Sequence, residues 1–149
     1  MSAARELNET LTGLASILSE HAAFAIEPVL REKGLGFGAF DLLATVRAAE
    51  GRETQGQIAA RLGIAPSSLT EAVASAVKKG LVEQLVVANN QRARRLMLTR
   101  EGEQVLDTCL AKLSAFETSL RQKVGASALD AAIETLRRAN EAALEIHGA

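Results

Sequence analysis

The sequence predicts a mainly α-helical protein with one small β-hairpin, an α+β arrangement, on three observations. The 149 residues hold only two prolines and are rich in Ala, Leu, Glu and Arg, which favours helices over a sandwich or barrel. Apolar residues recur at three- and four-residue spacing along most of the chain. Residues 81–98 alone change to short strand-like runs around Ala88-Asn89-Asn90-Gln91, a sequence typical of a hairpin.

The composition indicates one ordinary domain, or a small domain with an oligomerisation extension. Apolar residues make up 48% and charged residues 23%, so a packed core can form. No run approaches the ~18 apolar residues of a membrane span, and the N-terminus lacks the pattern of a secretion signal. The single cysteine, Cys109, excludes an internal disulfide framework. We therefore expect a cytoplasmic protein with no membrane partner.

The net charge of −1 hides an uneven distribution of charge. Between Glu50 and Arg100 there are eight basic and four acidic residues, whereas the remainder has nine basic and fourteen acidic ones. Such a block can be a solvated face. It is equally typical of a small nucleic-acid-binding protein, because it concentrates positive potential where phosphates dock.

The N-terminal part predicts one amphipathic helix from about residue 4 to 30. Its main apolar stripe is Leu7, Leu11, Leu14, Leu18, Ala22, Ala25 and Val29. Ile17, His21 and Phe24 form a second stripe, so we expect this helix to bury more than one face, with His21 packed. Pro28 should kink or end it. Residues 34–38 should form a turn, and no strand precedes them as a phosphate-binding glycine loop would require.

The middle of the chain predicts three helices and two strands. The helices are 37–49, with Phe40, Leu43 and Val46 or Arg47 along it; 54–62, capped by Thr54 and stopped by Gly63; and 67–79, with Pro66 at its start and Gly80 at its end. The strands are 81–87 and 94–98. Two short helices joined by Gly63-Ile64-Ala65 form a helix-turn-helix, and the hairpin makes it a winged helix whose second helix can enter a major groove.

The C-terminal part predicts two long helices. Thr99 caps the first, whose stripe is Leu106, Cys109 or Leu110, Leu113, Phe116, Leu120 and Val124. After Gly125 the last helix carries Leu129, Ile133, Leu136, Ala143 and Ile146. Stripes of this length cannot pack entirely on so small a core, which indicates burial against a second copy. The expected organisation is an N-terminal dimerisation helix (1–35), a winged helix-turn-helix (36–100) and C-terminal dimerisation helices (101–149).

Several short motifs in this order resemble the MarR family of multiple antibiotic resistance regulators. They are Gln57-Ile58-Ala59-Ala60-Arg61-Leu62-Gly63-Ile64, Ser67-Ser68-Leu69-Thr70, Gly80-Leu81-Val82-Glu83, and Arg92 placed six residues before Leu98-Thr99-x-x-Gly102. The resemblance implies a homodimeric transcriptional regulator that binds double-stranded DNA, with its terminal helices at the dimer interface. Many members of this family bind small aromatic or lipophilic effectors, so the resemblance offers such an effector as a candidate partner.

The sequence departs from this family at three places. The wing pattern Asp-Arg-Arg reads Asn90-Gln91-Arg92, so the acid that braces the wing in relatives is absent. Ala65 stands before Pro66 where relatives often have serine, and losing such a cap costs roughly 0.5–2 kcal/mol. The strand before the wing tip is the apolar Leu85-Val86-Val87. These changes bear on affinity and wing geometry rather than on the fold.

The helical wheel of 67–79 separates a core stripe from a candidate DNA-binding face. Leu69, Val73, Ala76 and Val77 should face the core. The predicted DNA contacts are Thr54, Gln55, Pro66, Ser67, Ser68, Thr70, Glu71, Ser75, Lys78, Arg92 and Arg94. Glu71 could accept from a cytosine amino group, and Arg92 could enter a minor groove. No arginine on this helix face can read guanine, so phosphate contacts and DNA shape should carry much of the binding. By strand alternation, Arg92 and Arg94 share one face and Arg95 the other.

Other chemistry is not indicated by the sequence. Cys109 lies within an apolar stripe and is expected to be a core or interface residue. Two histidines, His21 and His147, and one cysteine are too few for an ordinary zinc site, and no nucleophile–base or paired-carboxylate pattern is present, so we expect no metal, no cofactor and no enzyme.

The interpretation is a ligand-responsive repressor acting as a homodimer on an inverted-repeat operator. The alternative is a winged-helix module that docks protein. His21, Phe24, Phe37 and Phe40 are the predicted effector pocket.

Overall fold

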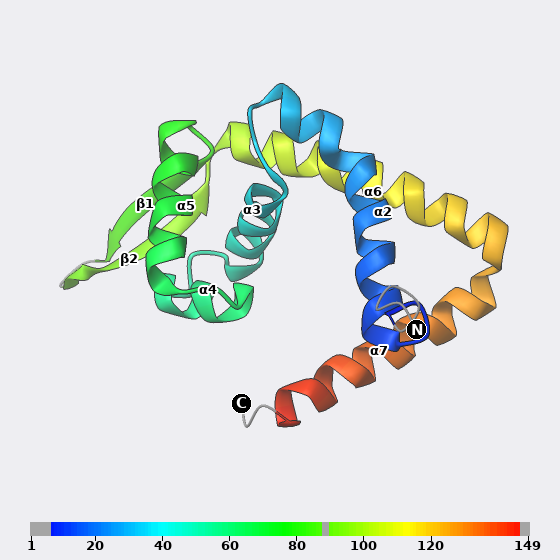
Figure 1. Cartoon of the computed structure of the whole chain (residues 1–149). Helices are drawn as coiled ribbons and strands as arrows, with labels where there is room; N and C mark the ends of the chain where they lie inside the picture. The colour runs from blue at the N-terminus through cyan, green and yellow to red at the C-terminus, as the bar shows by residue number, and fades with distance from the viewer. Residues whose placement is uncertain (1–6, 88–89, 147–149) are drawn as a thin grey trace. The chain divides into compact units, whose positions relative to one another are not determined.

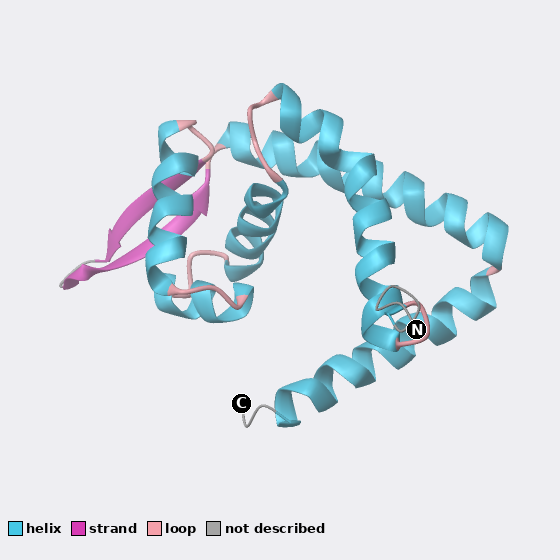
Figure 2. Ribbon diagram, viewed as in Figure 1, coloured by secondary structure: helices cyan, strands magenta, loops and turns pink. Residues whose placement is uncertain are grey.

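The computed structural model of the protein describes residues 7–87 and 90–146, with side chains described outside 87–93. Its elements, in chain order, are α2 (Leu11–Glu32), α3 (Phe37–Ala49), α4 (Gln55–Leu62), α5 (Pro66–Lys78), β1 (Val82–Val87), β2 (Asn90–Leu98), α6 (Arg100–Val124) and α7 (Ala126–Ile146) (Figure 1). In the described ranges the strands form one antiparallel hairpin among helices (Figure 2). The predicted fold class is confirmed. The chain divides into two compact units, residues 1–112 and 113–149.

The core of the first unit is built around α3, which contacts α2, α4, α5 and β2. Its fully buried side chains include Ile26, Leu42, Leu43, Val46, Ile58, Leu69, Val73, Leu96, Leu106 and Cys109. Burying each large aliphatic side chain stabilises the fold by about 1.5–3 kcal/mol. The expectation that Cys109 is a core residue is confirmed, and burial raises the pKa of its thiol.

Two neighbouring residues of α3, which the sequence left as alternatives, have different roles. Val46 is buried in the core. The Arg47 guanidinium instead reaches α6, where Nη1 lies 2.6 Å from Asp107 Oδ1 and 3.2 Å from Glu103 Oε2. Hydrogen bonds to these two carboxylates raise the pKa of Arg47. Arg47 therefore ties α3 to the first half of α6.

The first helix differs from the predicted span of about 4–30. A turn at residues 8–10 precedes α2, and the Thr10 hydroxyl accepts a hydrogen bond from the Gly13 amide at 3.0 Å as an N-cap. The leucine spacing continues across this break, so periodicity alone concealed it. Pro28 lies inside α2, which continues to Glu32. The proline therefore does not end the helix.

The hairpin is longer than the sequence predicted. β2 begins at Asn90, not Arg94, although Asn90 and Gln91 were expected in the loop. Pairing is regular from Val82↔Leu98 to Val86↔Arg94 and then shifts, so that Val87 pairs with Asn90. Asn90 joins the ladder by pairing with Val87 of the apolar run in β1, which local propensity does not foresee.

The base of the hairpin is fixed by the Leu98-Thr99-x-x-Gly102 motif. The Thr99 hydroxyl accepts from the Gly102 amide at 3.0 Å and donates to the Gly80 carbonyl at 2.6 Å. A Cβ on Gly102 would lie 2.1 Å from the Leu81 carbonyl oxygen, so only glycine permits this approach. The predicted cap of α6 is confirmed, and the motif joins the end of the hairpin to α6.

The second unit contains the end of α6 and α7. Arg121 Nη2 and Asp130 Oδ1 are 2.7 Å apart across Gly125. No residue of α7 is buried, and Ile133, Leu144 and Ile146 are exposed by 41%, 60% and 81%. Across the described parts of the chain, none of the helices combines the length and apolar character needed to cross a membrane.

Candidate nucleic-acid interface

The helix-turn-helix begins with a complete capping box at the start of α4. The Gln57 amide donates to the Thr54 hydroxyl at 3.2 Å, and the Thr54 amide donates to Gln57 Oε1 at 2.8 Å. These bonds satisfy two amides that a helix start would otherwise leave unpaired. The helix ends at Gly63, which is left-handed with φ +65°. The predicted limits of α4 are therefore confirmed.

The second helix, α5, begins without a side-chain cap. Ala65 makes no capping hydrogen bond, and Pro66 occupies the first turn. Leu69, Val73 and Ala76 are buried, by which α5 packs on the core. Val77 was expected beside them but is 40% exposed, because it lies at the last turn, at the edge of the packed face. The amides of the first turn of α5 thus have no side-chain partner on their own helix.

The predicted DNA-binding residues of α5 share one exposed surface. Ser67, Ser68, Thr70, Glu71, Ser75 and Lys78 are all exposed or half-exposed. The Thr70 hydroxyl donates to the Pro66 carbonyl at 2.9 Å, which leaves its oxygen free to accept. The surface therefore offers hydroxyl groups along its length, one carboxylate and one ammonium group. Thr54 and Gln55 lie half-buried at the start of α4.

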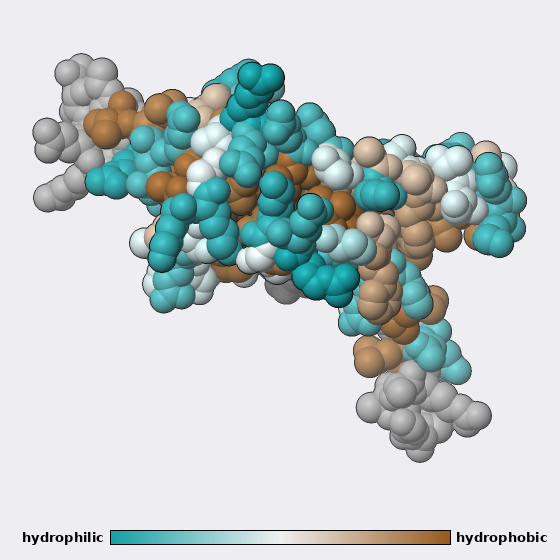
Figure 3. Space-filling view, turned by 90° about the horizontal axis from the view of Figure 1, so that it is seen from above, coloured by the Kyte–Doolittle hydropathy of each residue, from teal (hydrophilic) through white to brown (hydrophobic). Residues whose placement is uncertain are grey.

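The hairpin places Arg94 on its exposed side. Arg94 Nη1 donates to Gln84 Oε1 at 3.0 Å across the two strands. The side chain of Arg92 lies outside the described residues. The predicted alternation that puts Arg92 on the face of Arg94 therefore stays a prediction. Leu85 and Val86 are 46% and 65% exposed, and apolar surface is visible on the hairpin in Figure 3.

Sequence reasoning missed what Arg95 does. Strand alternation indicated that it faces away from Arg94, and it is half-buried. Its Nη1 donates to the backbone carbonyl of Arg52, and its backbone forms an isolated bridge with Thr54. No sequence motif signals this contact, because its acceptor is a main-chain oxygen.

The predicted effector pocket is present in part. A cavity of about 530 Å³ lies beside Phe24 and Phe37. Its other lining residues are Glu20, Ala23, Glu27, Leu30, Arg31, Gly34, Leu35 and Gly36. His21 and Phe40 do not line it: the His21 ring stands 6.3 Å from the Phe24 ring, and the Phe40 ring stands 5.7 Å from the Phe37 ring. His21 is exposed in the single chain, so its expected packing does not form within one chain. Helical spacing from Phe24 could have found Glu20, Glu27 and Arg31.

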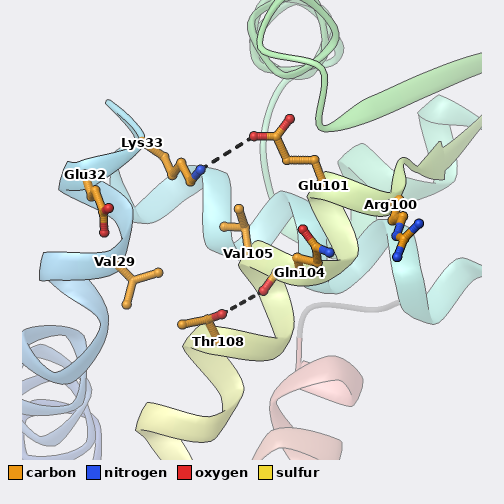
Figure 4. A pocket seen from close by; sticks show the side chains of 8 residues that line it. All are labelled: Val29, Glu32, Lys33, Arg100, Glu101, Gln104, Val105 and Thr108. Carbon is orange, nitrogen blue, oxygen red and sulfur yellow. Dashed lines mark hydrogen bonds and ion pairs between the residues drawn. The ribbon is translucent and has the colours of Figure 1, made fainter.

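A second cavity, of about 590 Å³, lies between the end of α2 and the start of α6 (Figure 4). Val29 and Val105 line it on the two helices. Lys33 Nζ lies 3.6 Å from Glu101 Oε1 at its edge, and Thr108 donates to the Gln104 carbonyl. The sequence did not predict this cavity, because its walls come from segments far apart in the chain.

The comparisons with known proteins place the helix-turn-helix in a family. The model of the MarR family matches residues 33–93, which include α3, α4, α5 and β1. This part of the chain is therefore similar to the MarR family. A comparison with curated protein sequences gives no match.

Three solved structures share the fold of most of the chain. PcaV from Streptomyces coelicolor, crystallised with its natural ligand, has a TM-score of 0.71 at 20% identity, covering 92% of this chain and 96% of its own. MarR from E. coli has a TM-score of 0.70 at 20% identity, covering 87% and 96%. MOSR from M. tuberculosis, in complex with DNA, has a TM-score of 0.62 at 24% identity, covering 91% and 98%.

Proposed function

We propose that the protein is a DNA-binding transcriptional regulator that acts in the cytoplasm as a homodimer on an inverted-repeat operator. The observation that carries the proposal is α5. One side of this helix is buried in the core, and the other presents hydroxyls and Lys78 to solvent. The match of residues 33–93 to the MarR family and the neighbour solved with DNA support the same role.

The chemistry of this surface favours phosphate contacts over direct reading of bases. The uncapped first turn of α5 offers free amides to a phosphate. Serine and threonine hydroxyls can contact phosphates or base edges, and Glu71 can accept from a cytosine amino group. Arg94 and Arg92 would place cations beside a neighbouring groove. Shape and deformability of DNA should therefore contribute much of the sequence preference.

The dimer would be formed by the apolar faces of α2, α6 and α7. Leu11, Leu14 and Leu18 on α2 are about half exposed, and α7 buries no residue. Apolar faces of this length in a single chain indicate an isologous contact with a second copy. Light scattering should then give twice the 15.7 kDa of one chain, about 31 kDa.

We infer that the regulator is a repressor released by a small aromatic or lipophilic effector in the cavity of Phe24 and Phe37. Leu30, Leu35 and the two rings offer apolar surface, and the Arg31 guanidinium, 3.2 Å from Glu27, can meet a polar group. PcaV was crystallised with its natural ligand. Displacement of a fluorescent dye by aromatic acids tests this. Phe24→Ala should weaken displacement, while Phe40→Ala, outside the cavity, should not.

DNA binding is tested by fluorescence anisotropy with the DNA upstream of the protein's own coding sequence, against a scrambled fragment of equal length. Specific binding with half-site centres ~10–10.5 base pairs apart, or a multiple of that, is expected in footprints. Equal affinity for both fragments would contradict sequence-specific binding. A single asymmetric half-site would contradict the two-fold dimer.

The alternative function, a module that docks protein, is favoured by one observation. Leu85 and Val86 expose apolar surface on the hairpin, where a DNA-contacting wing gains more from polar or basic groups. Replacing both with threonine separates the two functions. A regulator should keep its affinity for DNA within a few-fold, and a protein-docking module should lose its partner.

A further inference from the structure

The base of the hairpin is attached to residues 50–54, which we call the α3–α4 turn. Thr54 and Arg95 form a backbone bridge between the two segments. The Arg95 guanidinium donates to the Arg52 carbonyl within the same turn. One residue of β2 therefore holds the turn by its main chain and by its side chain.

A second residue on the same face of β2 packs on this turn. Alternate residues of a strand share a face, so Met97 lies beside Arg95. A Cβ on Gly51 would lie 2.8 Å from Met97 Sδ, and Gly51 has φ +68°. The backbone of the turn thus lies against the thioether of Met97, and its left-handed φ favours glycine at this position.

The α3–α4 turn leads directly into the first turn of α4. Thr54 is the N-cap of that helix, and Thr54 and Gln55 are among the proposed DNA contacts. The hairpin carries the other proposed contacts, Arg94 and Arg92. Arg95 thus lies between two groups of DNA contacts that are about forty residues apart in the chain.

We propose that Arg95 is a positioning residue for DNA binding, which fixes the hairpin to the α3–α4 turn so that both meet DNA as one unit. The proposal rests on the proposed function. The half-buried guanidinium uses a main-chain carbonyl as its acceptor, so the link does not depend on a neighbouring acid. Arg94, the adjacent residue of β2, bonds within the hairpin to Gln84 and is the matched control.

The first measurement is hydrogen exchange without DNA. The Arg52 amide donates to the Ala49 carbonyl at 2.9 Å, and the Thr54 amide donates to Gln57 Oε1 at 2.8 Å, so both report on the turn. Arg95→Met should speed their exchange about tenfold, and Arg94→Met should leave it unchanged. Arg95→Lys, which keeps one charged donor on a shorter stem, should restore part of the protection and guards against a variant that does not fold.

The second measurement is affinity for DNA across a salt series. Arg95→Met should weaken binding about threefold to tenfold and leave the slope of log affinity against log salt unchanged, because Arg95 touches no phosphate. Arg94→Met should flatten that slope, by about 0.9 for each phosphate that Arg94 neutralises in the wild type. An unchanged slope for Arg95→Met beside a flattened slope for Arg94→Met distinguishes positioning from direct binding of phosphate.

Three results would overturn the proposal. Unchanged exchange in Arg95→Met would show that Arg95 does not hold the turn, whatever happens to DNA binding. Faster exchange with full affinity for DNA would show a structural link without a positioning role. A flattened slope in Arg95→Met would show that Arg95 itself binds phosphate. If the wild type binds no DNA fragment, the proposed function fails together with the positioning role, and exchange alone still shows whether Arg95 holds the turn.

Discussion

Helices α5 and α7 are both amphipathic, yet only α5 buries its apolar side chains within its own chain. Leu69 and Val73 of α5 are each 1% exposed. No residue of α7 is buried, and Ile133 is 41% exposed. The same helical pattern therefore has two outcomes: in α5 it completes a core, and in α7 it leaves an apolar face exposed.

This difference separates the parts of the protein that the proposed dimer would cover from those that it would not. The winged-helix elements bury their apolar residues against α3 and should be stable whatever the protein concentration. The apolar faces of α2 and α7 expose their side chains to water unless another surface covers them, and such exposure is unfavourable. We therefore expect substitutions in α7 to change the oligomeric state and substitutions in α5 to change the free energy of unfolding.

The largest effect is expected on α7, from Ile133→Glu. Each copy in a dimer would lose about 1.5–3 kcal/mol of apolar burial, so two copies together lose about 3–6 kcal/mol. Light scattering at micromolar concentration should then give a monomer. Thr135→Glu introduces the same charge on another side of α7 and should leave the dimer intact. A dimeric Ile133→Glu would remove α7 from the interface.

The stability lost through a core substitution in α5 should not depend on the protein concentration. Leu69→Ala should lower the free energy of unfolding by about 2–5 kcal/mol, because the cavity it leaves is enclosed. Urea melts at two protein concentrations measure this. A loss that varies with concentration would mean that α5, like α7, is covered by a partner rather than by its own chain.

Removing a cation from the hairpin should weaken DNA binding, whereas removing a cation from α7 should not. Arg92→Ala should weaken operator binding by about 1–3 kcal/mol if it enters a groove. Arg138→Ala removes a cation from α7 and should leave affinity unchanged. With about six to eight phosphate contacts per dimer, the wild-type slope of log affinity against log salt should be roughly −5 to −7. Equal losses for both variants would point to a general charge effect.

The smallest expected effect is on stability, and it compares two threonine hydroxyls that make different hydrogen bonds. Thr54→Ala removes the cap of α4 and should cost about 0.5–2 kcal/mol of stability. Thr135→Ala removes a hydroxyl that bonds the Ala131 carbonyl within α7, and should cost close to nothing. Thermal melts of the two variants give the comparison. Equal costs would mean that the capping box adds little.

The helix-turn-helix was predictable because its limits are set by local chemistry. Thr54, Gly63 and Pro66 fix φ or satisfy free amides within a few residues, and the structure has α4 and α5 at the predicted places. The start of α2 and the extent of β2 were not predictable in this way. They depend on a turn hidden within a continuous leucine spacing, and on strand pairing that overrides the preference of Asn90.

The candidate site was predictable in its residue types more than in its contacts. The hydroxyls of α5 lie on one exposed surface, as its wheel indicated. The cavity includes Phe24 and Phe37 but not His21 or Phe40, because aromatic residues one turn apart do not all face the same space. The contact of Arg95 with the Arg52 carbonyl joins two segments through main chain, for which a sequence carries no signature.

The most direct test of the account is the number of chains bound to one operator. Sedimentation of the wild type with a labelled duplex that holds one footprint should show two chains on each duplex. The reason is that the dimer formed by the apolar helices presents two copies of α5 to the DNA. Ile133→Glu should bind the same duplex far more weakly, since each copy then meets a half-site alone. One chain on each duplex, or equal binding by the monomeric variant, would contradict the account.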